Sequence, residues 1–254
     1  MPDTTAGSGG DRRILMRGAI PTPRSELAAA TPHVPRIGAP PNIIRIPAQL
    51  DPDAWGNHQY GDCVTAEEAF NKGCATPSVY IPYDEVIAWA TKHGTLNGAY
   101  LTQVMHMMHT DGFAQDGHTY DDGPYFSVAW TNPSTLQSAI SLAPVKIGVA
   151  AQQLEAAYYT TNGNSGWFGH GFQPDATEDH CVSLSGYGSL AWLADQLHVQ
   201  VPAGLDPNAP GYALFTWGSI GIIDHPSMVA ITHEAWLRNP STVIKPGHAA
   251  PAAA

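Results

Sequence analysis

The sequence predicts an α+β protein with a helical N-terminal lobe, an antiparallel β-rich C-terminal lobe and a cleft between them. Two observations carry this prediction. Apolar residues recur at helical spacing from residue 63 to residue 111, and after residue 132 they alternate between Gly and Pro turns, as in short strands. Since each kind of element buries its apolar face against its own neighbours, this separation favours two lobes. With 254 residues, 43% of them hydrophobic, the chain can bury a substantial core.

Four segments are expected along the chain. Residues 1–45 are rich in Pro, Gly, Ala and Thr and show no sustained period, which predicts a flexible arm able to drape over the body. Residues 46–131 are expected to form the helical lobe, and residues 132–240 the β-rich lobe. Residues 241–254 are expected to be a disordered tail.

Three helices are expected in the first lobe, because three amphipathic stretches each end at a Gly, as helices often do. They are TAEEAFNKG from Thr65, YDEVIAWATKHG from Tyr83 and LTQVMHMMHTDG from Leu101. The second lobe is expected to begin with a short helix from Ser134, with Pro133 in its first turn and Asn132 or Ser134 as its cap.

Five stretches of the second lobe are expected to be strands or strand ends, since they alternate between Gly and Pro turns. They are PVKIGVAA, HCVSLSGYGS, LHVQVPA, YALFTWG and MVAITHEAW. Asp121 and Asp122 lie in a Gly-rich stretch and are expected to be solvated loop charges. Trp167, in GNSGWFGHG, is expected in a long loop of the second lobe.

The composition argues against several classes of partner. The formal net charge is −11 and only 11 Lys and Arg are spread along the chain, so no basic stripe is available for nucleic acid. No apolar run approaches the roughly 18 residues that a membrane helix requires, and we see no secretory leader. The three cysteines cannot all pair, which favours a reducing, cytoplasmic location. The sequence does not indicate the oligomeric state.

Neither a disulfide nor a metal site is expected. Cys74 follows Cys63 by about three helical turns, which places the two thiols roughly 16 Å apart. The chain has twelve histidines. Of these, His106 and His109 lie on one helix face, but no zinc-hydrolase pattern surrounds them, and a partly exposed helix face is the expected interpretation. No cofactor is expected.

The strongest chemical signal is a cysteine and a histidine in two distant segments. Cys63 lies in WGNHQYGDCVTAEEAF, where a Gly-Asp-Cys turn leads into a helix whose N-terminus would favour a thiolate. His180 lies in EDHCVSLSGYG, at the start of an expected strand that would hold the imidazole on rigid backbone. A cysteine nucleophile needs such a base across a cleft. The alternatives are a buried structural thiol and a core histidine.

These segments, with others in the same order, resemble the papain-like cysteine peptidase family. DHCVSLSGYG is similar to the family's base motif, STLQSAISLAPVKIGVAA to the helix and strand before it, LNGAYLTQVMHMMHTDGF to one wall of the substrate groove, and YALFTWG to the strand that ends in Asn-Ser-Trp-Gly. IPAQLDPDAW resembles the start of a mature enzyme, so the resemblance covers residues 46–236. The Asn-x-x-x-Gly-Asp-Cys string that ends at Cys63, and the Trp-Gly without its Asn, also resemble a divergent group of papain-like proteins in bacteria and phages.

The resemblance implies a papain-like two-lobe fold and a thiol-dependent hydrolase of peptide or small amide substrates, which would form an acyl-enzyme through Cys63 and His180. It places Gly98 and Ala99 in the cleft wall, where a peptide backbone would hydrogen-bond. Cys181 takes the position that lines the main specificity pocket in the family, so it either shapes that pocket or simply packs. Asp179 is expected to make a surface or turn contact, because neighbouring strand residues point to opposite faces.

The chain departs from the family pattern at three places. The family's oxyanion glutamine is replaced by Asn57, and the nearest glutamine is Gln59; the register favours Asn57. The aromatic residue after the nucleophile is Val64. The Asn that orients the base is absent, so His180 is expected to be held by Thr216, by a backbone carbonyl or by packing against Trp217, and to act in a dyad.

These departures keep two other functions open. One is a non-peptidase thiol amidase or acyltransferase, since the fold does not fix the substrate. The other is a catalytically inactive papain-fold module that binds a peptide or partner in its cleft. The N-terminal arm lacks the amphipathic helical pattern of the family's inhibitory propeptide. Either the chain is made ready for activity, or the arm partly covers the cleft.

Overall fold

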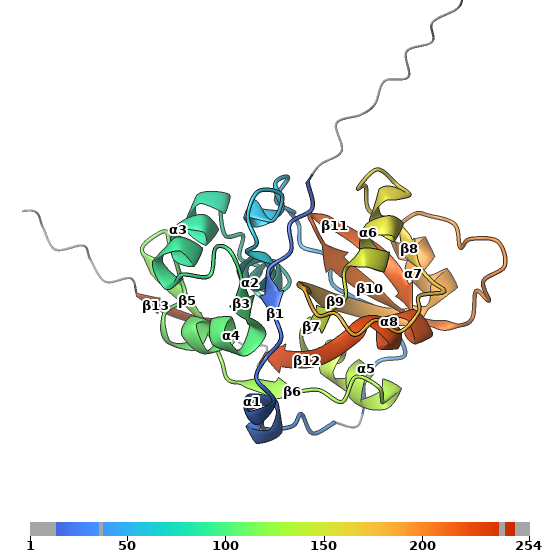
Figure 1. The fold of residues 1–254 in the computed structure, drawn as a ribbon, viewed down its shortest axis with the longest axis horizontal. Coiled ribbons are helices and arrows are strands. Elements are labelled where there is room, and N and C mark those ends of the chain that lie inside the picture. Colours follow the sequence, from blue (N-terminus) through green and yellow to red (C-terminus); the bar gives the residue numbers. More distant parts are fainter. Residues whose placement is uncertain (1–13, 36–37, 239–241, 247–254) are drawn as a thin grey trace, which may run out of the picture.

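The computed structural model describes residues 14–35, 38–238 and, for the backbone alone, 242–246. It confirms the α+β, two-lobe architecture (Figure 1). Three helices form most of the first lobe, and a large sheet with flanking helices forms the second. The three helices expected from the sequence are present as α2 (Cys63–Gly73), α3 (Tyr83–His93) and α4 (Leu101–Thr110), with a 3-10 turn η1 (Ala54–Gly56) before them.

The second lobe is built on an eight-stranded sheet in which most neighbouring strands are antiparallel. At one edge β8 runs parallel to β11, and β2 (Ile43–Ile44) pairs with β9 off the main path. In spatial order the strands are β6 (Tyr125–Ser127), β12 (Thr232–Arg238), β7 (Val145–Val149), β9 (His180–Ser189), β10 (Pro210–Thr216), β11 (Ser219–Asp224) and β8 (Phe168–Gly169).

Two small sheets complete the strand pairing. The hairpin of β4 (Phe113–Gln115) and β5 (His118–Asp122), which was not expected, is extended by β13 (Thr242–Pro246). Part of the expected disordered tail is therefore a paired strand; residues 241 and 247–254 lie outside the described part of the chain. The second small sheet joins β1 (Ala19–Ile20) to β3 (Ala99–Tyr100) in parallel.

The helices of the second lobe show where the sequence pattern misled. The expected helix is α5 (Pro133–Leu142), and Asn132 caps it by accepting a hydrogen bond from the Thr135 N–H. The expected strand LHVQVPA is wrong, because α7 (Leu190–Gln196) precedes it and Val199 and Val201 pack on the core outside any strand. The first part of MVAITHEAW belongs to helix α8 (His225–Ile231), not to a strand. Helix α6 (Gln152–Tyr159) was not expected from the sequence.

One expectation about loop residues is also wrong. Asp121 and Asp122 are buried in β5, where Asp122 forms an ion pair with Lys72 at 2.7 Å. The expected loop charge is thus part of the interior, stabilised by a partner 50 residues away in sequence. Trp167, in contrast, lies in the loop before β8, as expected; its side chain is buried, and its indole N–H donates to the hydroxyl of Ser219 at 2.9 Å.

Helix α2 joins the two lobes by apolar and by ionic contacts. Phe70 stacks on Phe215 of β10 with ring centroids 3.9 Å apart. Glu68, fully buried on the same helix, pairs with Lys146 of β7 and with Arg238 of β12. Because buried charges are costly unless paired, this cluster ties the helix to the sheet at a defined register.

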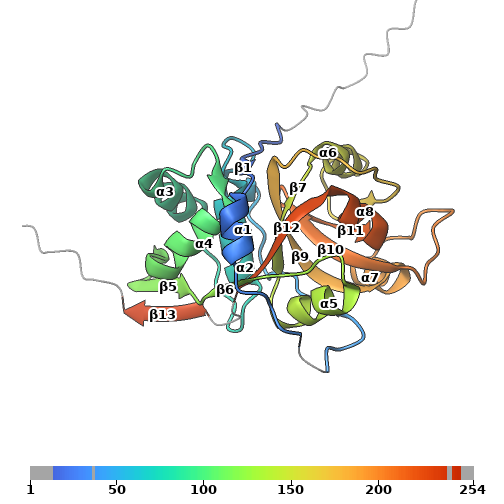
Figure 2. The same ribbon diagram turned by 60° about the horizontal axis from the view of Figure 1, so that its bottom comes forward.

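A segment of the N-terminal region lies across the boundary between the lobes. We call residues 14–33 the strap. It contains β1 and the short helix α1 (Arg24–Ala29), and Figure 2 shows both along the line where the lobes meet. Residues 1–13 and 36–37 of the expected arm lie outside the described part of the chain. None of the described helices is long and apolar enough to cross a membrane.

Candidate active site

Cys63 is the first residue of α2, as the Gly-Asp-Cys turn predicted. Asp62 occupies the N-cap position, but its side chain makes no capping hydrogen bond. The Cys63 side chain is buried, with 1% of its surface exposed. The helix N-terminus thus points its free N–H groups toward a sulfur that is closed off from water.

His180 is the first residue of β9 and is buried to the same degree. Its Nε2 lies 2.7 Å from the hydroxyl oxygen of Thr216, and its ring stacks on Trp217, with centroids 4.3 Å apart and an interplanar angle of 13°. Of the three contacts expected to hold this ring, those with Thr216 and with Trp217 therefore occur together. Its Nδ1 is buried and has no hydrogen-bond partner in the described part of the chain.

The turn from α2 and the start of β9 meet at the sulfur. The backbone of Cys181, the residue after His180, and that of Gly18 in the strap lie close enough to the Cys63 thiol to lower its pKa. No hydrogen bond joins the thiol to His180 among these described residues. The two side chains are therefore brought into one site, but not as a thiolate–imidazolium pair.

Burial sets the protonation state of both groups. It raises the pKa of Cys63 to about 12, against the opposing effect of the backbone hydrogen bonds. It lowers the pKa of His180 to about 3, and the charge of Arg17 lowers it further. The thiolate expected from the helix N-terminus is not the form of this closed state, because desolvation outweighs the helix field.

The candidate oxyanion residues differ in position. Asn57 is buried, and its side-chain amide donates to the backbone oxygen of Tyr60 at 3.1 Å. Gln59 is exposed, which leaves Asn57 as the better placed of the two. Asn57 also approaches the carboxyl group of Asp62 and favours its charged form. In this state the amide is occupied, so it would have to turn to bind an oxyanion.

Asp62 is a site residue that the sequence analysis did not single out. It is fully buried, and burial raises the pKa of its carboxyl group to about 8. When ionised it raises the pKa of Cys63 by charge repulsion. The signal was present in the Gly-Asp-Cys string, but the burial that gives the carboxyl group its influence comes from tertiary packing.

The strap occupies the cleft wall that was expected to bind a peptide. The Ala99 N–H donates to the Gly18 oxygen at 2.9 Å, and the Ala19 N–H donates to the Asp179 oxygen at 3.1 Å. Ala99 lies on the first lobe and Asp179 on the second, so the strap backbone bridges the cleft. Gly98 has φ +125°, a value that favours glycine, and it faces the same stretch of strap.

Further contacts fix the strap on both sides of Cys63. The Trp217 indole donates to the Met16 oxygen at 2.9 Å, and the Met16 N–H donates to the Asn57 oxygen at 3.2 Å. The guanidinium of Arg17 binds Asp179 at 2.7 Å and Glu155 of α6 at 2.6 Å. Asp179 thus makes the contact expected of a residue outside the catalytic set.

Cys181 is buried in the apolar cluster that also contains Cys63 and Ala19. Burial raises the pKa of its thiol well above the ordinary range. The thiol is therefore part of the apolar core beside the site, which is the packing role; a role in shaping a specificity pocket stays a prediction.

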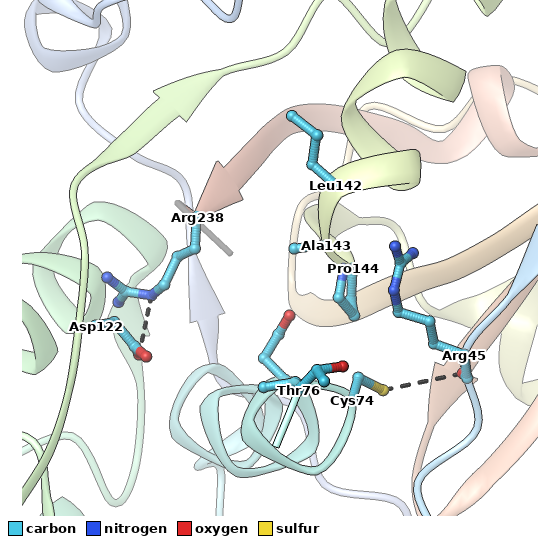
Figure 3. A pocket seen from close by; sticks show the side chains of 10 residues that line it. Arg45, Cys74, Thr76, Asp122, Leu142, Ala143, Pro144 and Arg238 are labelled. Carbon is cyan, nitrogen blue, oxygen red and sulfur yellow. Dashed lines mark hydrogen bonds and ion pairs between the residues drawn. The ribbon is translucent and has the colours of Figure 1, made fainter. Parts of the chain in front are cut away.

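A separate cavity of about 260 Å³ lies between the lobes at the opposite end of α2 (Figure 3). Arg238 and Asp122 form one wall and Pro144 and Leu142 another, while Cys74 lies below Pro144 with its sulfur directed toward Arg45. The Cys74 thiol is free, as expected, and burial raises its pKa, so it is not a reactive thiol. This cavity lies apart from the Cys63 site.

Comparisons with solved structures find cysteine proteases of similar fold. The Amb a 11 cysteine protease of ragweed pollen in its proform has a TM-score of 0.57 and 10% identity, covering 80% of this chain and 67% of that one. Xylellain, a cysteine protease from Xylella fastidiosa, has a TM-score of 0.55 and 14% identity, covering 93% and 100%. The Carica candamarcensis cysteine protease CMS1MS2, solved with E-64, has a TM-score of 0.54 and 14% identity, covering 79% and 98%.

No protein-family model and no curated protein matches the sequence. At these identities the structural matches establish the fold alone. The chain has the papain-like two-lobe fold.

Proposed function

We propose that the chain is a thiol-dependent hydrolase of amide or peptide bonds that acts through Cys63 and His180 and is held latent by its own strap. The observation that carries the proposal is that a peptide segment, Met16–Ala19, already lies over Cys63 and is bound by backbone hydrogen bonds from both lobes. A substrate chain can use the same donors and acceptors once the strap leaves.

The chemistry follows from the groups at the site. With the strap displaced, water reaches both side chains, the cause of their pKa shifts is removed, and the thiol proton can pass to His180 Nδ1. The thiolate then attacks the substrate carbonyl carbon, and His180 returns the proton to the leaving amine. Water hydrolyses the thioester after giving a proton to His180. The Thr216 hydroxyl can accept from Nε2–H and so hold the tautomer that leaves Nδ1 free.

Two groups would stabilise the oxyanion in this scheme. The N–H of Cys63, at the helix N-terminus, is one, and the amide of Asn57 is the other after it leaves the Tyr60 oxygen. That change links activation to a local movement of the loop before α2. The strap itself contacts this loop through the Met16 N–H, so its release frees the Asn57 backbone as well.

The same geometry favours one alternative, an inactive module that binds a peptide in its cleft. The occupied Asn57 amide and the absence of a hydrogen bond between Cys63 and His180, both within the described residues, are the observations on its side. A non-peptidase amidase or acyltransferase would share the Cys63 chemistry and differ only in the substrate.

The test is hydrolysis by a chain whose strap is loosened. A Gly18→Ala variant should release peptides from a denatured, fluorescently labelled protein faster than the parent chain does. Cys63→Ser and His180→Gln in the same background should each abolish the gain. A loosened chain that binds the denatured protein but cleaves neither it nor small amides would favour the binding module.

A further inference from the structure

The cavity at the opposite end of α2 from Cys63 is bounded by both lobes (Figure 3). Asp122 of β5 and Thr76, which follows α2, belong to the first lobe, whereas Arg238 of β12 and Pro144, directly before β7, belong to the second. Thr76 is exposed, so the cavity can be reached from solvent. Its volume of about 260 Å³ gives room for about eight non-hydrogen atoms, at about 30 Å³ for each water-sized group.

One wall carries a buried carboxylate oxygen that lacks a hydrogen-bond donor. Asp122 is 6% exposed, and its Oδ1 accepts from Lys72 at 2.7 Å. Its Oδ2 lies 3.2 Å from Arg238 Nε, but that N–H donates to Glu68 at 2.9 Å. Oδ2 accepts no hydrogen bond from any residue that the structure describes. Burial raises the pKa of the Asp122 carboxyl group although both cations oppose the rise, so its charged form still needs a donor.

A guanidinium without a carboxylate partner lies on the other side of the cavity. Arg45 follows β2, and its backbone N–H donates to the Ser185 oxygen of β9 at 2.9 Å. Its Nη1 and Nη2 donate to the backbone oxygens of Ile140 and Ser141, in the last turn of α5, at 2.5 Å and 2.6 Å. No carboxylate oxygen of the described residues lies within 4.0 Å of Arg45. The two carbonyls thus fix the guanidinium, which has further N–H donors for a ligand.

The charges around the cavity favour an anion. The ion pairs between α2, β5 and the large sheet contain three buried cations and two buried carboxylates: Lys72, Lys146, Arg238, Glu68 and Asp122. Glu67, buried on the same helix, stays neutral, because burial raises its pKa well above the ordinary range. Asp121 points to the opposite face of β5 from Asp122. With Arg45, the ion-paired groups have two positive charges in excess, which an anion in the cavity would balance.

The two sides of the cavity ask for different groups on a ligand. An ammonium at Asp122 Oδ2 would lie beside Arg238, 3.2 Å from that oxygen, and near Lys72, which occupies the other oxygen. A neutral hydroxyl supplies the missing proton without this repulsion. At the other side, a carboxylate matches the planar guanidinium of Arg45 and supplies the missing negative charge.

We propose that this cavity binds a small hydroxy acid, whose hydroxyl group donates to Asp122 Oδ2 and whose carboxylate accepts from Arg45. The bound molecule bridges the lobes, since Asp122 belongs to the first lobe and Arg45 is hydrogen-bonded to the sheet of the second. Cys63 lies at the other end of α2, so this binding is independent of the proposed hydrolysis.

The test is isothermal titration calorimetry of the full-length chain with unbranched ω-hydroxy acids of about three to six carbons, the range that the cavity can hold. The tightest is compared with three probes of equal length: the fatty acid, which lacks the hydroxyl; the diol, which lacks the carboxylate; and the ω-amino acid, which carries an ammonium. The hydroxy acid should bind at least about tenfold more tightly than each, because each substitute leaves a buried group unpaired or repelled. Equal binding of the fatty acid would overturn the inference.

Two variants locate the binding. Ala143→Leu places an apolar side chain in the cavity, and Ala191→Leu adds the same group at an exposed position of α7. Affinity for the hydroxy acid should fall at least about tenfold in the first and change less than about twofold in the second. Arg45→Gln should weaken the hydroxy acid at least about tenfold and the diol less than about twofold, because only the former carries the carboxylate.

Three results would overturn the inference: no heat from any hydroxy acid at about 10 mM with the folded parent chain, binding that Ala143→Leu leaves unchanged, or an equal loss of hydroxy acid and diol in Arg45→Gln. Circular dichroism melts show whether each variant is folded. If Arg45→Gln loses its fold with the contact to α5, the comparison of probes and the Ala143→Leu variant still decide the question.

Discussion

Gly18 is the position at which the strap is most sensitive to a single added methyl group. A Cβ on Gly18 would lie 1.7 Å from the backbone oxygen of Gly61 and 2.8 Å from its Cα, distances that no side-chain rotation can relieve. Gly61 is itself buried next to Asp62 and Cys63. The strain of Gly18→Ala is therefore expected to fall on the strap, which has fewer buried contacts than the body.

The size of the effect follows from the cost of overpacking. Inserting a methyl group into a closely packed contact costs about 1 to 3 kcal/mol, which multiplies the population of the open strap about 5-fold to 150-fold. If opening is fast relative to alkylation, the iodoacetamide reaction at Cys63 accelerates by the same factor. Peptide mass mapping gives the rate at each cysteine, and Cys74, which is buried and remote from the strap, should stay unreactive unless the whole chain unfolds.

Two controls isolate the strap from the rest of the chain. Ile14→Ala changes a strap residue that is 68% exposed and should leave the Cys63 rate within about twofold. The thermal midpoint, followed by circular dichroism, shows whether the body of Gly18→Ala stays folded. A folded Gly18→Ala chain whose Cys63 reacts no faster than in the parent would refute the idea that the strap covers the nucleophile.

Three further predictions concern charge. Asp62→Asn in the Gly18→Ala chain should speed Cys63 alkylation only as the pH rises through about 8, because the carboxyl group is neutral below that pH; a uniform gain at all pH values would contradict the electrostatic cause. The pKa of His180 lies near 3 in the folded chain, so protonation of the imidazole favours unfolding, and the free energy of unfolding should fall by about 3 kcal/mol from pH 7 to pH 4. Urea unfolding of His180→Gln should lack this part of the fall. The same pH dependence in both chains would disprove the prediction. Glu68→Gln should cost about 3 to 5 kcal/mol of unfolding free energy, whereas Lys92→Gln, which breaks an exposed pair, should cost less than about 1 kcal/mol; similar losses would contradict the burial argument.

The sequence located the catalytic candidates because their signals are local. Cys63 begins a helix and His180 begins a strand, and both boundaries follow from turn and periodicity patterns within a few residues. Thr216 and Trp217 could be named as holders of the imidazole because they occupy the place of the missing Asn. The two-lobe fold followed from the same kind of evidence, the change of period near residue 132.

The parts that escaped prediction depend on contacts between distant segments. Asp122 looked like a loop charge, since nothing near it in sequence indicates the Lys72 that neutralises it. The strap makes its contacts through backbone groups of Gly18 and Ala19, which leave no pattern of side chains to recognise. Glu178 and Glu234 are far apart in sequence, and both side chains pack over Gly148 of β7 only in the folded sheet.

In the closed state the strap blocks access to Cys63 and keeps its thiol uncharged, and burial is the cause of both effects. The same burial that hides the thiol raises its pKa and lowers that of His180, so the proton stays on sulfur while the strap is bound. In water the ordinary pKa values of thiol and imidazole differ by only about two units, and the helix N-terminus narrows the gap further. Opening therefore makes the nucleophile both reachable and reactive.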